Sequence, residues 1–393
     1  MKKILILNGS FCEVPIIKRA KEMGYYVVTT GNAPELEGHK YSDEYIACDY
    51  SDKDAILDLV KENNIEGIVS CANDFGVLTA SYVCEKMGWK GHDSYENAVM
   101  IHHKDRFKEY CNNHNIPSPH SMVFLNIGDA KEYCAKCEYP IIVKANDLTG
   151  GKGIKKAENY AQAEEALTNA FEWSRDKHIL VEPFIQGTQH SICVFLVDKK
   201  IIASSSCQSY SFKNPYLIQS ETFPSRYIQG KIKKDLEEII ENMAQDLNLS
   251  DGILNLQLII KDDKPYIIEC MRRSFGNDAL MPYTKVTGFD WVEAYIRVSL
   301  GEKISCKDKY VAEDRYCGHF GVFADKNGEL KSCFIDDEIE KHIFKKINMI
   351  LPSQKIENYM NERIMYLYFS YDDIEEMNKD ICTYNDRIRV EIV

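Results

Sequence analysis

The sequence predicts a multidomain protein of the α/β and α+β classes, with a parallel α/β domain first and a small α+β domain last. Residues 1–91 alternate short apolar runs with helical patterns, whereas shorter strands prevail after Gly301. A chain of 393 residues is also too long for one ordinary hydrophobic core. We therefore expect three domains, over residues 1–95, 96–305 and 306–393.

The first domain is predicted to be a parallel sheet covered by helices. Its strands are KILIL, YYVVTT and GIVSC, and its helices span residues 14–23 and 52–63. The turn after the first strand, NGSF, holds a single glycine, so this sheet lacks a dinucleotide-binding fingerprint. We expect it to act as a scaffold that lends one edge to a substrate pocket.

The rest of the chain combines helices with hairpins. A helix is predicted to begin at Lys104 and to end before Pro117 and Pro119. Apolar spacing predicts two more helices, at residues 161–173 and 232–247. Strands and hairpins are predicted for HILVEPF, SICVFLVDKKIIASSS, GILNLQLIIKDDKPYIIEC and GVFADKNGEL, and a strand–helix–strand unit closes the chain.

Composition argues against several classes of function. The formal net charge is −13 and no block of Lys or Arg stands out, which argues against nucleic-acid and anionic-membrane partners. No run approaches the roughly 18 apolar residues of a membrane span, and the N-terminus lacks the apolar core of a signal peptide. The 14 cysteines are scattered, often inside apolar runs, which is typical of a reducing compartment. We expect a cytoplasmic protein.

The stretch YPIIVKANDLTGGKGI points to an anion site. An apolar strand ends in Lys144, and a loop follows in which Gly150, Gly151 and Gly153 surround Lys152. Glycines let backbone N–H groups close on an anion without Cβ atoms in the way. The spacing matches neither a P-loop nor the dinucleotide fingerprint. Taken alone, the stretch fits both a phosphate site and a surface hairpin.

A second polar cluster follows the last apolar strand before residue 280. Glu269 precedes Arg272 and Arg273, and Gln257 lies across the predicted hairpin turn. In an antiparallel pair, Gln257 and Glu269 can face the same side and share a Mg²⁺ ion, while an arginine holds the phosphates that the metal bridges. The alternative is a plain ion pair at a strand end, with Gln257 facing solvent.

Five segments in one order resemble the ATP-grasp superfamily, with the biotin carboxylase and carbamoyl-phosphate synthase branch closest. They are KDRFKEYCNNHNIPSP, PIIVKANDLTGGKGI, ILVEPFIQG, GILNLQLIIKDDKPYIIEC and RRSFGND. The resemblance covers residues 1–301, and the tail from residue 306 matches less clearly. It implies a pre-ATP-grasp domain followed by an ATP-grasp domain, with ATP and Mg²⁺ as cofactors and Mn²⁺ as an alternative metal.

The resemblance also implies roles for individual residues in holding the nucleotide. Lys104 and Lys144 look like the two lysines that contact the ATP phosphates, and Glu182 looks like the hinge acid near the adenine amino group. The remaining implied nucleotide contacts are the glycine lid with its lysine (Gly150, Gly151, Lys152, Gly153), the adenine edge (Pro183, Phe184, Ile185) and the ribose position (Gln189).

For the reaction itself, the resemblance implies that Gln257 and Glu269 ligate the metal. Arg273, Lys144 and Glu269 are the implied catalytic residues, with Arg273 on phosphoryl or acyl-phosphate oxygens. The chain departs from the family at Met271, where an asparagine is usual, and a thioether is a poor ligand for Mg²⁺. It departs again at Gln189, where many members carry an acid, and at Gln257, although the carbamoyl-phosphate synthase branch also uses glutamine there.

The expected function is an ATP-dependent carboxylate–amine ligase for small metabolites, which forms ADP and phosphate through an acyl phosphate. Bicarbonate activation through carboxyphosphate and an ATP-binding protein with weakened catalysis are the alternatives. The resemblance also implies a homodimer, since members of the family commonly form one. The substrate is expected to meet three parts of the chain: Asn73 and Asp74, the segment around Lys213, and residues 272–278, which include Gly276, Asn277 and Asp278.

Overall fold

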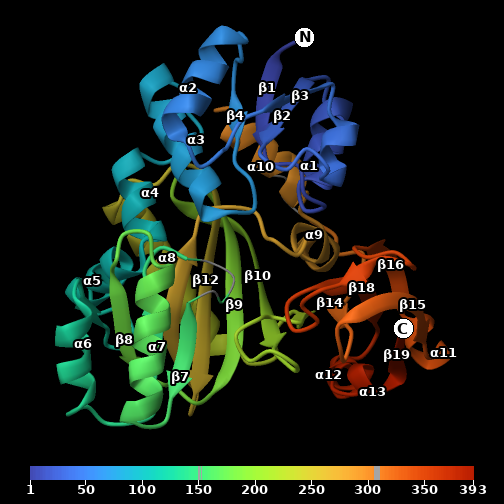
Figure 1. Ribbon diagram of the computed structural model, residues 1–393. Helices are drawn as coiled ribbons and strands as arrows, with labels where there is room; N and C mark the ends of the chain where they lie inside the picture. Colours follow the sequence, from blue (N-terminus) through green and yellow to red (C-terminus); the bar gives the residue numbers. More distant parts are fainter. Residues whose placement is uncertain (149–150, 152, 305–309) are drawn as a thin grey trace.

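The computed structural model describes residues 1–148, 151, 153–304 and 310–393 (Figure 1). The N-terminal sheet lies at the top of Figure 1, the antiparallel sheets of the central region lie below it, and the C-terminal strands lie at the lower right. The predicted fold class is confirmed: a parallel sheet with helices comes first and antiparallel sheets follow.

The N-terminal sheet is parallel, with strand order β3-β2-β1-β4. Residues 4–7 of β1 are fully buried, as expected for a strand with helices on both faces. The strands are β1 (Lys3–Leu7), β2 (Tyr26–Gly31), β3 (Glu44–Ala47) and β4 (Ile68–Val69), and the helices are α1 (Val14–Glu22), α2 (Lys53–Glu62) and α3 (Asp74–Met87), with a 3₁₀ turn at Glu37–Tyr41.

A small antiparallel sheet with order β5-β8-β6-β7 carries the lysine–glycine stretch. It packs against its own helices through small apolar side chains such as Ala163 and Ala166. The lead-in helices are α4 (Tyr95–His102) and α5 (Lys104–Asn113), and the unit contains β5 (Met122–Phe124), α6 (Ile127–Cys134), β6 (Ile141–Ala145), β7 (Ile154–Ala157), α7 (Tyr160–Trp173) and β8 (Ile179–Pro183).

A single eight-stranded antiparallel sheet contains both the central hairpins and C-terminal strands, in the order β13-β12-β9-β10-β11-β14-β18-β16. Its strands therefore come from both sides of the boundary predicted at residue 305, which itself falls outside the described residues. The strands are β9 (Thr188–Val197), β10 (Lys200–Tyr210), β11 (Ser220–Phe223), β12 (Gly252–Lys261), β13 (Lys264–Met271), β14 (Tyr316–Phe323), β16 (Ile343–Asn348) and β18 (Arg363–Tyr371).

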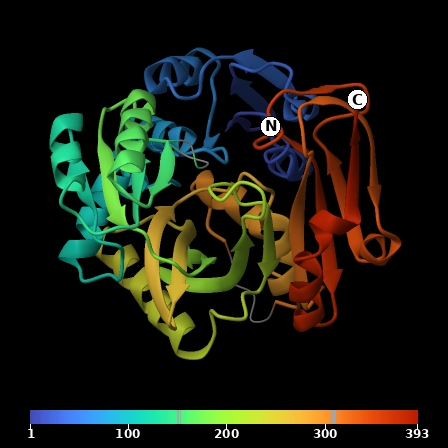
Figure 2. The same ribbon diagram turned by 60° about the horizontal axis from the view of Figure 1, so that its bottom comes forward.

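Helices and a second small sheet complete the molecule, and Figure 2 shows the C-terminal part beside both the N-terminal and the central parts. Ile4 of β1 and Phe195 of β9 belong to one buried cluster with Trp291, so the N-terminal and large sheets share a core. Within the described residues, no helix has the length and apolar character needed to cross a bilayer. The remaining elements are α8 (Gly230–Asp246), α9 (Leu280–Thr287), α10 (Trp291–Ser299), β15 (Gly328–Ile335), α11 (Asp337–Glu340), β17 (Lys355–Ile356), α12 (Ile374–Ile381), α13 (Tyr384–Arg387) and β19 (Ile388–Ile392).

Candidate active site

Lys144 lies at the end of buried strand β6, and the structure gives it a buried acidic partner. Its Nζ atom is 2.6 Å from Oε2 of Glu182 on the adjacent strand β8. The two side chains lie on the same face, because Ile142, two residues before Lys144, is directly opposite Glu182 in the antiparallel register. Both side chains are almost fully buried. The predicted phosphate lysine and the predicted hinge acid are therefore neighbours.

Lys108, which belongs to none of the predicted site residues, lies on the other side of the Glu182 carboxylate. Its Nζ atom is 3.5 Å from Oε1 of Glu182 and donates to Oγ of Ser118 at 2.7 Å and to the carbonyl of Ile267 at 3.2 Å. Burial lowers the pKa of Lys108 to about 8, although Glu182 pulls it upward. Burial would also raise the pKa of Glu182, but Lys144 and Lys108 lower it to about 2.

Lys104 connects the end of β6 with the end of β13. Its Nζ atom donates to the carbonyl oxygens of Leu148 at 2.6 Å and Asn146 at 3.4 Å, and it lies 3.4 Å from Oε1 of Glu269. The side chain is 10% exposed, whereas that of Glu269 is 23% exposed. The structure thus brings a predicted phosphate lysine to a predicted metal ligand, with the carboxylate open to solvent.

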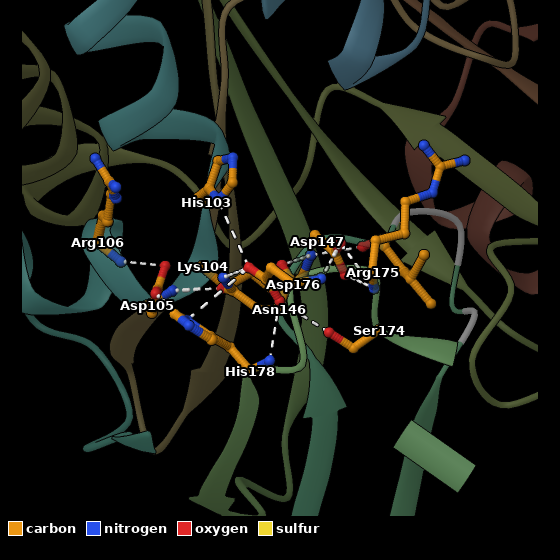
Figure 3. A network of polar contacts seen from close by, with 11 residues as sticks. His103, Lys104, Asp105, Arg106, Asn146, Asp147, Ser174, Arg175, Asp176 and His178 are labelled. Atoms are coloured by element: carbon orange, nitrogen blue, oxygen red, sulfur yellow. Dashed lines mark hydrogen bonds and ion pairs between the residues drawn. The ribbon is translucent and has the colours of Figure 1, made fainter. Parts of the chain in front are cut away.

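Asn146 fixes this arrangement from the centre of the polar network in Figure 3. Its side chain accepts a hydrogen bond from the backbone N–H of Asp105 at 2.9 Å and donates to Oδ2 of Asp176 at 2.6 Å. Its backbone N–H donates to the carbonyl of His178 at 3.1 Å. One fully buried amide therefore joins the start of α5, the end of β6 and the turn before β8.

Gln257 and Glu269 are directly opposite each other on β12 and β13, as the hairpin pattern predicted. Both residues are partly exposed, and their amide and carboxylate oxygens are hard donors of the kind that Mg²⁺ prefers. Asn255, two residues before Gln257, has a buried Oδ1 atom without a hydrogen-bond partner. Met271, opposite Asn255, contributes no oxygen; its Sδ atom lies 3.3 Å from Nη2 of Arg273. The oxygen donors fit a hard divalent cation.

Arg273 is held by the N-terminal helix α3. Its Nε atom donates to Oδ1 of Asp74, the first residue of that helix, and Nδ1 of His102 lies 3.2 Å from the same oxygen. Burial would raise the pKa of Asp74, but Arg273 and His102 hold it well below its usual range. Asp74, the partner of Arg273, lines one cavity of about 280 Å³ together with Lys104.

The glycine loop requires glycine at the two described positions, Gly151 and Gly153. Both have positive φ angles, 77° and 66°. A Cβ atom on Gly153 would lie 2.9 Å from Cβ of Ala145, and one on Gly151 would lie 2.3 Å from the carbonyl oxygen of Tyr216. Gly150 and Lys152, also predicted to cover the phosphates, lie outside the described residues.

The predicted adenine segment follows β8 directly. Pro183 is exposed, while Phe184 and Ile185 are partly buried. The backbone N–H of Phe184 donates to the carbonyl of Pro140 at 3.0 Å, so this N–H already has a partner. An open cavity of about 940 Å³ borders the segment and is lined in part by Tyr139, Pro140, Glu182, Pro183 and Phe184. Gln189 is partly buried near the start of β9, opposite Ile259 of β12 and Ser209 of β10.

Three of the side chains expected near the substrate are occupied by other contacts. Arg272 is buried and paired with Asp93 at 2.8 Å, which ties the chain before α4 to β13. Lys213 contacts Asp325 at 2.5 Å and the carbonyl of Ala324. Asn73 caps α3 by accepting from the N–H of Phe75. Residues 272–278 were expected to meet the substrate, but the guanidinium of Arg272 is used within the fold.

Two residues after Arg273 make contacts between distant elements. Asn277 donates from Nδ2 to Oε2 of Glu221 at 2.7 Å, and Asp278 lies 3.1 Å from Nζ of Lys345 on β16. Burial raises the pKa of Asp278 to about 6, although Lys345 opposes the rise. The loop after Arg273 is thus held by β11 and β16 of the large sheet.

A family model described as "Carbamoyl-phosphate synthase L chain, ATP binding domain" matches residues 103–307. That range is more than half of the 393 residues and contains Lys104, Lys144, Glu182, Glu269 and Arg273. The chain belongs to this family. The resemblance to the ATP-grasp superfamily, predicted from the sequence, is therefore confirmed.

The ATP-grasp chain is also similar to the carbamoyl phosphate synthase large chain of Clostridium acetobutylicum, with 21% identity over 306 residues. The match includes 76% of this chain but only 28% of that protein, so the chain spans less than a third of the length of this relative.

Solved structures share the ATP-grasp fold along the whole chain. The L-amino acid ligase from Bacillus licheniformis has a TM-score of 0.83 at 16% identity, with 100% of this chain and 99% of that chain covered. The biotin carboxylase domain dimer of Hydrogenobacter thermophilus 2-oxoglutarate carboxylase, in complex with MgADP, ADP and bicarbonate, has a TM-score of 0.79 at 18% identity, with 100% and 91% covered. These likenesses extend the fold assignment to the C-terminal part.

Proposed function

We propose that this protein is an ATP-dependent carboxylate–amine ligase that acts on small metabolites and forms ADP and phosphate through an acyl phosphate. The observation that carries the proposal is the position of Lys104, 3.4 Å from Glu269. Lys104 also lines a cavity of about 280 Å³ together with Asp74, the partner of Arg273. A carboxylate that attacks the γ-phosphorus brings anionic groups together, so the reaction needs cationic groups that are already in place.

In the proposed reaction, Lys104 and Lys144 hold phosphate oxygens of ATP, and Arg273 stabilises the oxygens of the transferred phosphoryl group. Glu269 and Gln257 would hold Mg²⁺, which would neutralise phosphate charge when bound. The loop around Gly151 and Gly153 excludes water, so the acyl phosphate reaches an amine before it hydrolyses. Attack by the amine then releases phosphate and leaves an amide.

We place the organic substrates in an open cavity of about 710 Å³ that adjoins the loop after Arg273. It is lined by Phe11 from the N-terminal part, Gly276 from that loop, and Arg363 and Tyr366 from β18. The rings of Phe11 and Tyr366 lie 5.1 Å apart. Residues from three parts of the chain thus line a space of the size of a small-metabolite site.

Bicarbonate activation through carboxyphosphate is the second candidate within the enzyme class. Its support is the family match itself and the similarity to a biotin carboxylase domain whose structure contains bicarbonate. An ATP-binding protein with weakened catalysis is the third candidate, since Met271, two residues after Glu269, offers a thioether where the resemblance implies an asparagine. A homodimer, as in that biotin carboxylase domain, is also proposed for this chain.

One experiment separates these candidates: ADP release with Mg²⁺ and ATP, measured across pairs of carboxylates and amines, with Arg273→Met as the inactive control. ADP release that requires both a carboxylate and an amine supports the ligase. Release with bicarbonate and no carboxylate or amine favours carboxyphosphate formation instead. Tight ATP binding without any release that depends on added substrate favours the binding protein and rules out the ligase.

A further inference from the structure

Lys108 is a buried cation that the proposed reaction does not use. Its side chain is 3% exposed, and it is located one helical turn after Lys104 on α5. Removing an ammonium group from water is unfavourable unless an anion compensates it. The nearest anion is the Glu182 carboxylate, and this carboxylate already has Lys144 as a closer partner.

The three side chains form a buried group with two positive charges and one negative charge. Lys144 contacts Oε2 of Glu182, while Lys108 and the hydroxyl of Ser121 face Oε1. Each oxygen of the carboxylate therefore has its own cation. The group retains one positive charge, which an additional anion in this pocket would compensate.

Lys144 has two competing roles in this arrangement. It is the partner of Glu182 at 2.6 Å, and it is the lysine proposed to contact the ATP phosphates. If Lys144 were the sole cation here, the buried carboxylate of Glu182 would compete with phosphate for the ammonium group of Lys144. A second cation that remains on Glu182 removes much of this competition, since the carboxylate stays compensated when Lys144 turns toward the nucleotide.

We infer that Lys108 is a positioning residue for the nucleotide: it remains the counter-ion of Glu182 when nucleotide binds, and it leaves the charge of Lys144 available to phosphate. The inference depends on the proposed nucleotide site. The groups that face the Lys108 ammonium are Glu182, Lys144, the Cys111 thiol, Ser118 and the Ile267 carbonyl. Within that set, Glu182 is the only carboxylate, so the effect of Lys108 should depend on Glu182.

Nucleotide affinity should depend on pH in one direction. Lys108 carries its proton below its pKa of about 8 and loses it above. Once Lys108 is neutral, Lys144 is the remaining ammonium beside Glu182. Glu182 then competes more strongly with phosphate for Lys144. Nucleotide affinity should therefore be highest below pH 8 and fall as the pH rises through 8 to 9.5.

The test is calorimetric titration with Mg²⁺ and a non-hydrolysable ATP analogue between pH 6.5 and 9.5. Lys108→Met should lower affinity at pH 7 by about tenfold, the size of coupling between contacting charged groups, and should flatten the pH profile. In a chain that already carries Glu182→Gln, Lys108→Met should have little further effect, because no carboxylate remains to hold Lys144. Lys231→Met, which removes an exposed lysine on α8, is the control and should match the wild type.

The outcomes separate the role of Lys108 from the proposed function. Wild-type binding that Lys108→Met leaves unchanged across the pH range overturns the role of Lys108 alone. An equal loss from Lys108→Met in the wild-type and the Glu182→Gln backgrounds, with an unaltered pH profile, shows a purely structural lysine and also overturns it. A wild-type chain that binds no nucleotide contradicts the proposed function and this inference together. Circular dichroism of each variant shows whether it is folded.

Discussion

Individual residues in this site are held by partners from other elements. Glu182 lies between two lysines, Asp74 reaches from α3 to Arg273, and Lys104 reaches from α5 to Glu269. Ion pairs of this kind, buried or partly buried, are weak evidence for stability because desolvation offsets much of the attraction. Their value is that they orient charges within the site.

Lys144→Met should weaken ATP binding strongly while leaving a folded chain. The variant removes the buried ammonium next to Glu182. Methionine is also unbranched and of similar length, so it keeps the apolar part of the side chain. We expect a loss of about 2 kcal/mol in nucleotide binding, in the range for charged hydrogen bonds. Calorimetry with ATP and Mg²⁺ measures it, and unchanged affinity would exclude Lys144 from the phosphate site.

Glu269→Gln should abolish metal-dependent turnover. Gln257 already supplies a neutral amide oxygen opposite this position, so the substitution would leave no carboxylate in the pair. Divalent cations bind carboxylates far better than amides, and the rate of ADP release should no longer respond to Mg²⁺ or Mn²⁺. A rate equal to that of the wild type at every metal concentration would remove Glu269 from the metal site.

At the scale of elements, the glycine loop and the strands beside it were predictable, but their side-chain partners were not. The apolar run before Lys144 and the Gln257–Glu269 hairpin carry strong local patterns, so their strands and register could be inferred. Lys108 was missed, although its spacing of four residues from Lys104 places both on one helix face. The pairing of Arg272 with Asp93 was also missed, because no local pattern connects residues so distant in sequence.

Gly153→Ala should destabilise the loop next to β6. The substitution puts a Cβ atom 2.9 Å from that of Ala145 at a φ of 66°. The left-handed conformation alone costs about 1 kcal/mol, and the steric overlap adds to it. Gly24→Ala is the matched control, since its φ is 88° and a Cβ atom there meets nothing within 4 Å. Thermal unfolding should show a larger decrease for Gly153→Ala, and equal decreases would contradict this reading.

At the scale of the whole molecule, contacts between distant segments hold the site together. The N-terminal and large sheets share the cluster that contains Ile4, Phe195 and Trp291. Asp278, three residues before Met281 of α9, is paired with Lys345 of β16, so the loop after Arg273 depends on the C-terminal strands. The division into domains at residues 95 and 305 stays a prediction, since the strands of one sheet come from both sides of the second boundary.

Asp278 should make stability fall as pH rises from 4 to 6. Its folded pKa is raised to about 6 by burial, so the folded state holds a proton that the unfolded state has already lost in this range. Compared with Asp278→Asn, the wild type should lose about 1–3 kcal/mol of unfolding free energy between these values. Urea denaturation of both proteins at pH 4, 5 and 6 measures it, and parallel curves would contradict the assignment.

The continuous eight-stranded sheet has a consequence for any attempt to work with a shorter chain. β11 lies between β10 and β14, so a chain that ended at residue 304 would lack β14. The backbone N–H and C=O groups of β11 on that side would then have no partner strand. An unpaired strand edge of this kind can pair with strands of other molecules. A fragment that ends at residue 304 should therefore aggregate, whereas in the whole chain β14 covers that edge of β11.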